Sequence, residues 1–289
     1  MLRVGAMTPD AGPVDPGHAA ESEWLPRWGL TPVGDAVTTA SSTLTPVRTR
    51  DGAPAMIKLS HSEEETRGAA LLDAWDGHGA VRVLRRQGDA VLIERAEDPY
   101  ALVTLVETGD DDAATRILCR TADTLHAASD AVMITDARLR PVPLEQWFRD
   151  LFAHEDDSDL QRRGATIARR LLGEQREVRV LHGDLHHGNV LHFGDRGWLA
   201  IDPKGLVGDR AFDFCNLLCN PSHEVALRPG RLERQFRVVT EAASLDAKRL
   251  ADWLVAWCAL SSTWFAIDGA DALAASAARI GERAMTLVP

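Results

Sequence analysis

The chain has 289 residues, of which 45% are hydrophobic, and its formal net charge is −11 at pH 7. This length suits one bilobal unit or two small domains, and the hydrophobic content is sufficient for a buried core. The negative charge argues against an anionic partner, whether nucleic acid or membrane. It is compatible with a cationic small substrate or with ordinary solubility.

The N-terminal stretch, residues 1–23, is rich in proline and glycine and has no apolar core of signal-peptide length. We expect it to be a flexible leader. No run of apolar residues approaches the length that spans a bilayer. We therefore expect a cytoplasmic protein without membrane or nucleic-acid partners, and we take it to be a monomer or a weak homodimer.

From residue 24 to residue 96 the pattern is rich in strands and includes one helix, so we expect a small β-rich domain there. The expected strands cover 33–38, 44–49, 55–59, 81–84 and 90–94. Ser41 and Ser42 lie in the turn after the first strand, where their side chains and backbone N–H groups could bind phosphates. Turns rich in Ser and Thr are also common without any ligand.

Lys58 lies within an apolar strand, where an unpaired charge would be costly. A lysine that bridges nucleotide phosphates and a helix glutamate accounts for it, and an edge-strand lysine that points to water is the alternative. Ser62 begins the next helix, which runs to Trp75, and Glu65 stands at the capping-box position. Glu65 is therefore either a capping residue or the partner of Lys58, and Glu64 competes for that pairing.

The strand pattern ends at Glu94, and after Tyr100 it becomes helical, so we place a second and larger domain at 97–289. In a kinase the segment that begins at Glu94 would form the hinge between the lobes. There Glu94 and Ala96 would present backbone groups to the adenine edge. The expected helices cover 113–129, 143–153, 160–172, 209–220, 232–243, 250–267 and 271–285.

Two residue types within this helical half have a structural interpretation. Cys215 and Cys219 share one helix face, which favours buried free thiols over disulfides or zinc ligands. Trp253, Trp257 and Trp264 stand at helical spacing and are expected in the core.

The most informative pattern lies about two thirds of the way along the chain. A polar loop is followed by two short apolar strands that a Gly/Asp turn at 194–197 joins. This hairpin places Asp184, Asn189 and Asp202 at the same end of one small sheet. The series from His182 to Asn189 has the H-x-D-x-x-x-x-N spacing of the kinase catalytic loop, and Asp202 follows where a metal-binding aspartate is expected.

Phosphoryl transfer needs these residue types. We assign Asp184 to orient the attacking hydroxyl and take its proton, and Asn189 and Asp202 to hold Mg²⁺ against the nucleotide phosphates. The alternative is that they are common turn residues, but then the spacing, the strand pair and the last aspartate coincide by chance.

The histidines of this stretch raise the question of a zinc site. No Cys pair and no H-E-x-x-H accompanies them. We interpret His182 as bracing the loop, and His187 as a neighbour of the metal or of the substrate.

These motifs resemble those of the aminoglycoside phosphotransferase family, in particular its streptomycin 6-kinase and hydroxyurea phosphotransferase branch. The resemblance rests on HGDLHHGNVL and RGWLAIDPKGLVGD, with DGAPAMIKL, GHGAVRVL, VLIER and CALSSTWFAIDG in support. It implies an α+β, protein-kinase-like bilobal fold with a small β-rich N-lobe and a larger helical C-lobe. It also implies ATP and Mg²⁺ as cofactors, with Lys58 on the α- and β-phosphates, Asp184 catalytic, and Asn189 and Asp202 on the metal.

Two departures from the family pattern bear on the substrate. Gly188 stands where related enzymes often have Glu. Lys204 follows Asp202-Pro203 where similar streptomycin kinases often have His, and it puts a positive charge beside the metal site.

The function that we expect is ATP-dependent phosphorylation of a hydroxyl on a cationic, streptomycin-like aminoglycoside. Acidic C-lobe residues should hold its cationic groups. Asp184, His187 and Asp268 are the candidate substrate residues, although Asp268 also fits a helix-end carboxylate. A kinase for hydroxyurea, an amino sugar, choline or homoserine is one alternative, and a non-catalytic nucleotide-binding regulatory module is another.

Overall fold

The N-terminal part of the protein is an antiparallel sheet with one helix. The computed structural model describes residues 23–130, 132 and 139–288, so the expected leader lies outside the described residues except for Glu23. The sheet has the order β1-β3-β4-β6-β5, and β2 pairs with β3. Its strands are β1 (Thr31–Pro32), β2 (Val37–Thr38), β3 (Ser42–Arg48), β4 (Pro54–Ser60), β5 (Val83–Gln87) and β6 (Ala90–Glu94).

Two expected strands are shorter or shifted. Of residues 33–38, Val37 and Thr38 form β2, whereas Val33 is tied to β3 by a single backbone hydrogen bond, from its N–H to the carbonyl oxygen of Pro46 at 2.9 Å. β5 begins at Val83 rather than Val81, because the N–H of Val81 donates to Ala200 of the second lobe.

The two faces of the sheet belong to different apolar clusters. Alternate residues of a strand point to opposite faces, and β6 accordingly sends Ala90 and Leu92 to one cluster and Val91 and Ile93 to the other. The first cluster includes Trp24 and Trp28 from the helical segment 23–28. The second is continuous with the core of the helical half and includes buried residues of α2 (Glu63–Trp75).

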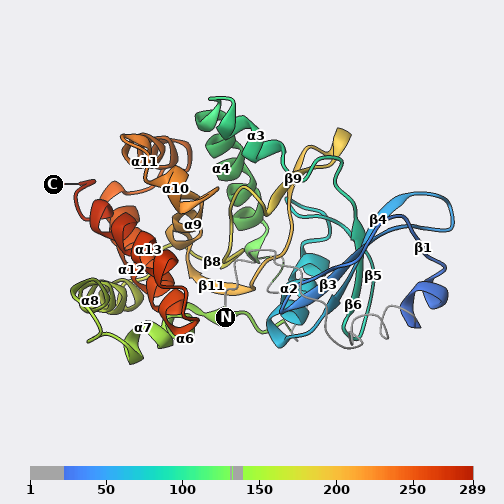
Figure 1. Ribbon diagram of the computed structural model, residues 1–289, viewed down its shortest axis with the longest axis horizontal. Helices are drawn as coiled ribbons and strands as arrows, with labels where there is room; N and C mark the ends of the chain where they lie inside the picture. The colour runs from blue at the N-terminus through green and yellow to red at the C-terminus, as the bar shows by residue number, and fades with distance from the viewer. Residues whose placement is uncertain (1–22, 131, 133–138, 289) are drawn as a thin grey trace.

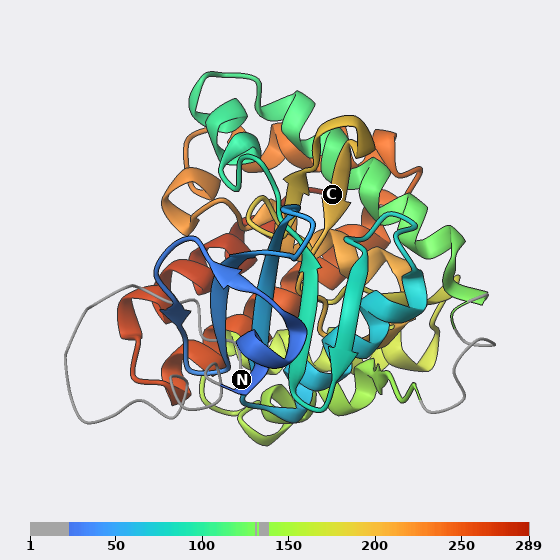
Figure 2. The same cartoon turned by 90° about the vertical axis from the view of Figure 1, so that its right-hand side faces the viewer.

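The remainder of the chain is mainly helical, and the expected bilobal arrangement of a small β-rich N-lobe and a larger helical C-lobe is confirmed (Figures 1 and 2). Its helices are α3 (Ala101–Glu107), α4 (Asp111–Ala127), α6 (Leu144–Trp147), α7 (Arg149–Ala153), α8 (Asp159–Gly173), α9 (Cys215–Leu218), α10 (His223–Ala226), α11 (Arg231–Ala242), α12 (Ala247–Ile267) and α13 (Asp271–Ala284). The helix expected at 143–153 is divided into α6 and α7, and the one expected at 209–220 starts as the 3₁₀ segment η2 (Arg210–Phe214).

α12 is the central helix of the C-lobe and packs against α13, α8 and α7. By length and composition it meets the criteria of a membrane-spanning helix, contrary to our expectation that no stretch approaches that length. However, 83% of its most apolar 18-residue stretch is buried inside the structure, so α12 is a core helix of the C-lobe. Trp253, Trp257 and Trp264 are buried on this helix, as expected, and the four cysteines are buried free thiols.

Two small sheets position the loops between the lobes. β9 (Val190–His192) pairs antiparallel with β10 (Trp198–Ala200), which confirms the hairpin, and the turn between them is the 3₁₀ segment η1 (Gly194–Arg196). A second sheet, which the sequence pattern did not predict, places β11 (Leu206–Asp209) between β8 (Val178–Leu181) and β7 (Val142–Pro143). The loop after β8 and the segment before β11 are thereby held side by side.

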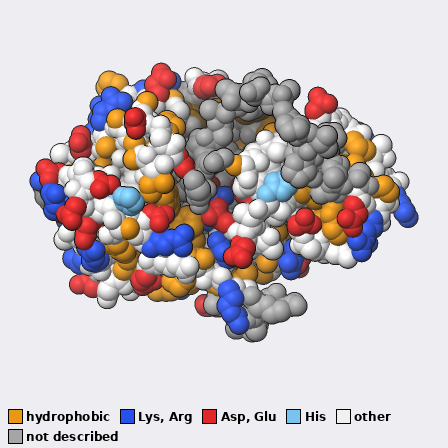
Figure 3. Space-filling model, turned by 60° about the horizontal axis from the view of Figure 1, so that its bottom comes forward, with side chains coloured by type: hydrophobic (Ala, Val, Ile, Leu, Met, Phe, Trp, Pro, Cys, Tyr) orange, Lys and Arg blue, Asp and Glu red, His pale blue; other side chains and the backbone are white. Residues whose placement is uncertain are grey.

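The surface carries charges of both signs. On the face that Figure 3 presents, Asp and Glu side chains are interspersed with Lys and Arg over both lobes.

Candidate active site

A cleft with a volume of about 650 Å³ lies between the two lobes. β3, β4 and α2 form one wall, and the loop before β9, the segment after β10 and parts of α9 and α12 form the other. The expected site residues that line it are Ser41, Ser42, Lys58, Glu65, Asp184, Asn189 and Asp202. Residues that are far apart in the sequence therefore meet around one cavity.

Lys58 lies in the middle of β4, between β3 and β6. Because side chains alternate along a strand, Ile57 and Leu59 join the outer apolar cluster while Lys58 lines the cleft. Its ammonium group contacts the carboxylates of Glu65 and Asp202, and its side chain is 12% exposed. Lys58 is thus not an edge-strand lysine directed to water.

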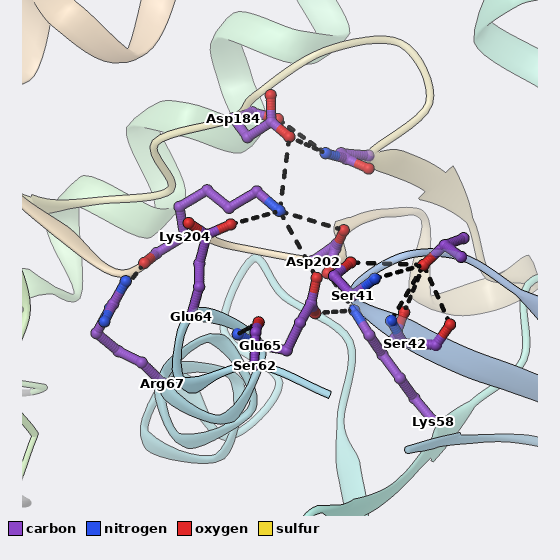
Figure 4. Close-up of polar contacts among 12 residues, drawn as sticks. Ser41, Ser42, Lys58, Ser62, Glu64, Glu65, Arg67, Asp184, Asp202 and Lys204 are labelled. Carbon is purple, nitrogen blue, oxygen red and sulfur yellow. Dashed lines mark hydrogen bonds and ion pairs between the residues drawn. The ribbon is translucent and has the colours of Figure 1, made fainter. Parts of the chain in front are cut away.

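The two competing glutamates of α2 differ in their nearest lysine. Glu65 contacts Lys58, whereas Oε1 of Glu64 lies 3.3 Å from Nζ of Lys204. The backbone N–H of Glu65 also donates to Oγ of the capping residue Ser62 at 3.3 Å. Glu65 therefore serves the helix cap through its backbone and the lysine through its side chain. Figure 4 shows the two lysines entering the group of carboxylates from different sides.

The loop after β8 is anchored from η2. The backbone N–H groups of His182 and Gly183 donate to the two carboxylate oxygens of Asp213 at 2.9 and 2.7 Å, and His126 bonds to the same carboxylate at 2.8 Å. Burial would raise the pKa of Asp213, but the hydrogen bond from His126 brings it below the usual range. Asp209 caps η2 instead, since it accepts from a backbone N–H of that segment. Asp213 therefore holds the catalytic loop, whereas Asp209 caps the helical segment.

Asp184 lines the cleft and is almost fully buried. Its Oδ1 accepts a hydrogen bond from Nδ2 of Asn216 at 2.6 Å, and its Oδ2 accepts from Nδ2 of Asn189 at 3.3 Å. Burial raises the pKa of Asp184 from its ordinary 3.8 to about 7, although Lys204 opposes this shift. A carboxylate with a pKa near neutral is well suited to accept a proton. Asn216 was not predicted, and the only signal was a polar residue within an apolar helical pattern.

Asn189 and Asp202 offer oxygen atoms to the cleft. The amide nitrogen of Asn189 donates to Asp184, which leaves its Oδ1 without a hydrogen bond to the described residues. The described residues contain no group of three or more His, Cys, Asp or Glu that could hold a metal. Mg²⁺ usually takes one or two protein oxygens together with phosphate oxygens and water, so this donor pair fits Mg²⁺ beside a nucleotide.

Asp202 has an unusual backbone conformation. Its φ is +58°, in the left-handed region that residues other than glycine seldom adopt. The residue also precedes Pro203, and a proline restricts the residue before it. Burial would raise the pKa of Asp202, but the charges of Lys58 and Lys204 lower it well below the usual range. A strained backbone that holds an ionised carboxylate in a cleft is typical of functional sites.

The histidines of the loop have three different positions. His182 is fully buried, with Nε2 2.8 Å from the carbonyl oxygen of Ile201 and Nδ1 accepting from the N–H of Asp184 at 3.2 Å, so it braces the loop as expected. His187 does not reach the cleft: it is 1% exposed, and its ring nitrogens have no partner among the described residues. His186 lines the cleft in its place, 3.9 Å from Oδ2 of Asp184, and burial lowers its pKa to about 4.

Ser41 and Ser42 line the cleft, but the backbone N–H groups that were expected to bind phosphates are bonded to a neighbouring residue. The backbone N–H groups of Ser41 and Ser42 donate to Oγ1 of Thr39 at 3.3 and 3.1 Å. Those N–H groups are therefore engaged within the turn, and Thr39 itself lines the cleft.

The expected hinge residues lie outside the cleft lining. Neither Glu94 nor Ala96 lines it, whereas Ile93 does. The N–H of Glu94 donates to the carbonyl of Arg82 at 3.3 Å, and its carboxylate contacts Arg196. Glu94 thus ties the N-lobe to η1.

The part of the cleft that residues 216–223, α12 and α13 line is neutral among the described residues. Asp268 is exposed at the C-cap of α12 and does not line the cleft, so it has the helix-end role considered as its alternative. Among the described residues, the carboxylates that line the cleft are Glu64, Glu65, Asp184 and Asp202. Beyond Asp184 the wall consists of neutral groups, which include Asn220, Ser222, His223, Trp257, Phe265 and Leu273.

Comparison with known sequences identifies relatives of this chain. A family model described as aminoglycoside/hydroxyurea antibiotic resistance kinase matches residues 27–269. The chain is 44% identical over 250 residues to streptomycin 3''-kinase from Klebsiella pneumoniae, covering 85% of this chain and 92% of that protein. It is 33% identical over 278 residues to streptomycin 6-kinase from Streptomyces glaucescens, covering 91% and 88%. It is 32% identical over 278 residues to hydroxyurea phosphotransferase from Kitasatospora aureofaciens, covering 89% and 75%.

Solved structures share the fold. A thermostable variant of aminoglycoside phosphotransferase APH(4)-Ia, in complex with ADP and hygromycin B, aligns with a TM-score of 0.61 at 13% identity, over 93% of this chain and 98% of that one. A choline/ethanolamine kinase family protein from Mesorhizobium loti aligns with a TM-score of 0.61 at 13% identity, over 93% and 94%.

Proposed function

The chain belongs to the aminoglycoside/hydroxyurea antibiotic resistance kinase family, and we propose that it transfers the γ-phosphoryl group of ATP to a hydroxyl of streptomycin. The observation that carries the proposal is the meeting of Lys58, Asp184, Asn189 and Asp202 around one cleft between the lobes. The 3''-hydroxyl is the proposed acceptor, because identity to the streptomycin 3''-kinase, at 44%, exceeds the 33% to a 6-kinase.

In this mechanism the chain positions reactants more than it reacts with them. Lys58, held by Glu65, binds the α- and β-phosphates. Asn189 and Asp202 would hold Mg²⁺, which would neutralise charge on the phosphate oxygens. The acceptor hydroxyl donates a hydrogen bond to Asp184. As its oxygen bonds to the γ-phosphorus, the bond from that phosphorus to the ADP oxygen breaks and Asp184 takes the proton. The products are ADP and a phosphomonoester.

The neutral C-lobe wall gives the acceptor a defined chemistry. Its aromatic faces, Trp257 and Phe265, attract cationic groups, and Asn220, Ser222 and His223 supply hydrogen-bonding groups for sugar hydroxyls. Residues 24–96 are the proposed nucleotide-binding lobe, and 97–289 the lobe with the catalytic, metal and substrate groups. We place the enzyme in the cytoplasm. We propose that it is a monomer or weak homodimer, and light scattering of the purified protein tests this oligomeric state.

The test has a cellular arm and a chemical arm. Expression should protect cells from streptomycin, and the purified protein with ATP and Mg²⁺ should yield a product heavier by one HPO₃ group, with phosphorus NMR locating the modified hydroxyl. Asp184→Ala should abolish transfer and keep ADP binding, while Lys248→Met on the surface should change neither. Full turnover by Asp184→Ala would refute the assignment of the catalytic residue.

Hydroxyurea is the second candidate acceptor, because a hydroxyurea phosphotransferase is also a relative. The same mass assay with hydroxyurea, choline and homoserine separates these acceptors from streptomycin. If the protein consumed no ATP with any of these acceptors, a non-catalytic nucleotide-binding module would be the better explanation.

A further inference from the structure

Lys204 lies where carboxylates from both lobes meet. Its Nζ is 3.3 Å from Glu64, 3.7 Å from Asp202, 3.9 Å from Glu65 and 4.0 Å from Asp184. Its side chain is only 9% exposed, yet it lines the cleft (Figure 4). One ammonium group therefore faces the proposed base, the proposed metal ligand and the helix that orients Lys58.

The backbone at Lys204 is fixed on both sides. Its N–H donates to the carbonyl oxygen of His182 at 2.7 Å, and its own carbonyl oxygen accepts from Nε of Arg67 at 3.0 Å. The preceding residue packs so closely on α2 that a Cβ on Gly68 would lie 2.2 Å from the carbonyl oxygen of Pro203. Lys204 is thus held between α2 and the catalytic loop, with its ammonium directed into the cleft.

The residue type is itself informative. The chain contains 32 Lys and Arg residues, and the sequence shows that only three of them are lysines, at positions 58, 204 and 248. Two of the three line the cleft, and Lys248 lies on the surface with 63% of its side chain exposed. Outside the cleft, the buried carboxylate of Asp209 is paired with an arginine, Arg249. An ammonium is a compact point charge with three donors, whereas a guanidinium is a planar fork, so the two are not interchangeable beside phosphates and carboxylates.

The two lysines of the cleft, Lys58 and Lys204, occupy different places in it. Lys58 reaches from the N-lobe sheet, and the proposed mechanism places it on the α- and β-phosphates. Nζ of Lys204 lies 4.0 Å from Oδ2 of Asp184 and 3.7 Å from Oδ2 of Asp202, so it is near both the proposed base and the proposed metal ligand. In the proposed mechanism the γ-phosphoryl group would pass between these two residues, from the ADP oxygen to the acceptor oxygen. A cation at that place is close to the three equatorial oxygens, where charge accumulates during transfer.

We propose that Lys204 is a second phosphate-binding lysine, which contacts the γ-phosphoryl group while it is transferred. This rests on the proposed kinase function. Lys204 forms no covalent bond and moves no proton; it offers N–H donors and a positive charge to the γ-phosphate oxygens. Glu64, whose Oε1 lies 3.3 Å from Nζ, helps to hold the ammonium group at the cleft.

The main test compares two nucleotides, because ADP lacks the group that Lys204 is to contact. Lys204→Met should weaken binding of the ATP analogue AMP-PNP by about tenfold or more and change ADP affinity by less than about twofold. Turnover (kcat) with streptomycin should fall by about 10²–10³, with KM for streptomycin nearly unchanged. Lys204→Arg should recover part of kcat, and Lys248→Met is the matched control. Equal effects on ADP and AMP-PNP, or an unchanged kcat, would overturn the proposal.

A second measurement uses the unaltered protein and so does not depend on how a variant folds. An amine-acylating reagent followed by mass mapping should find Lys58 protected by both ADP and AMP-PNP, and Lys204 protected by AMP-PNP only. Protection of Lys204 by both nucleotides, or by neither, contradicts the inference. If the protein binds neither nucleotide, the kinase function fails first; if it binds both and phosphorylates streptomycin without selective protection, only the role of Lys204 fails.

Discussion

Replacing Asp184 by Asn should stabilise the nucleotide-free protein, by an amount that depends on pH. Burial raises the pKa of Asp184 from 3.8 to about 7. The folded chain therefore keeps this proton up to about pH 7, whereas the unfolded chain releases it near pH 4. Stability is lost as the pH rises between these values, and the loss is complete above pH 7. A shift of about three pH units corresponds to about 4 kcal/mol.

The asparagine introduced by Asp184→Asn would carry no charge, so the substitution removes this dependence. Lys204 loses one partner in the variant but keeps three other carboxylates within 4.0 Å. The free energy of unfolding of the variant minus that of the wild type should grow by about 1.4 kcal/mol per pH unit from about pH 5 to 7, and then stay constant.

Urea unfolding without nucleotide or divalent ion, followed by the fluorescence of the eight tryptophans, measures this difference. Asp156→Asn is the control, because that side chain is 90% exposed and should give no slope with pH. A difference that does not vary with pH, or a variant that is less stable at about pH 8, would refute the reasoning.

Three further predictions concern activity and packing. Because Asp184 must be ionised to accept a proton, kcat/KM should fall about tenfold per pH unit below about pH 7 and be flat above it, and a flat profile across that range would contradict the role. Gly68→Ala would force α2 away from the carbonyl oxygen of Pro203, so the free energy of unfolding should drop by about 1–3 kcal/mol and KM for ATP should rise. Gly173→Ala, which has no atom within 4 Å of its new Cβ, should instead be neutral or stabilising by about 0.5 kcal/mol in the same melt. Asp209→Asn leaves a buried guanidinium without its carboxylate and should lower the free energy of unfolding by about 3–5 kcal/mol in urea; a loss below about 1 kcal/mol would show that the pair is dispensable.

The residues that the sequence placed correctly around the cleft are those whose chemistry fixes their spacing. Asp184 and Asn189 come from one loop, and Asp202 from the end of the adjoining hairpin, so local strand patterns were enough to bring them together. Lys58 was recognisable because a charge within an apolar strand needs a partner. The choice between Glu64 and Glu65 could not be made from the sequence, because both lie in the first turn of α2 and both contact a lysine of the cleft.

The remaining errors have a common physical origin in long-range packing. The direction of a side chain in an irregular loop has no period, so His187 was chosen where His186 lines the cleft. Asn216 reaches Asp184 only because η2 and the loop fold onto each other. β11 pairs with β8 across 24 intervening residues of active-site loop and hairpin, and such a pairing leaves no local signature.

The contact between Lys58 and Asp202 joins the two lobes directly, across 144 positions of sequence. An incoming nucleotide and its metal must separate these two groups, since each has to exchange its partner for a phosphate or an ion. Small molecules that bridge the pair instead of separating it would hold the enzyme in its resting state. Such an inhibitor of antibiotic inactivation need not imitate a triphosphate.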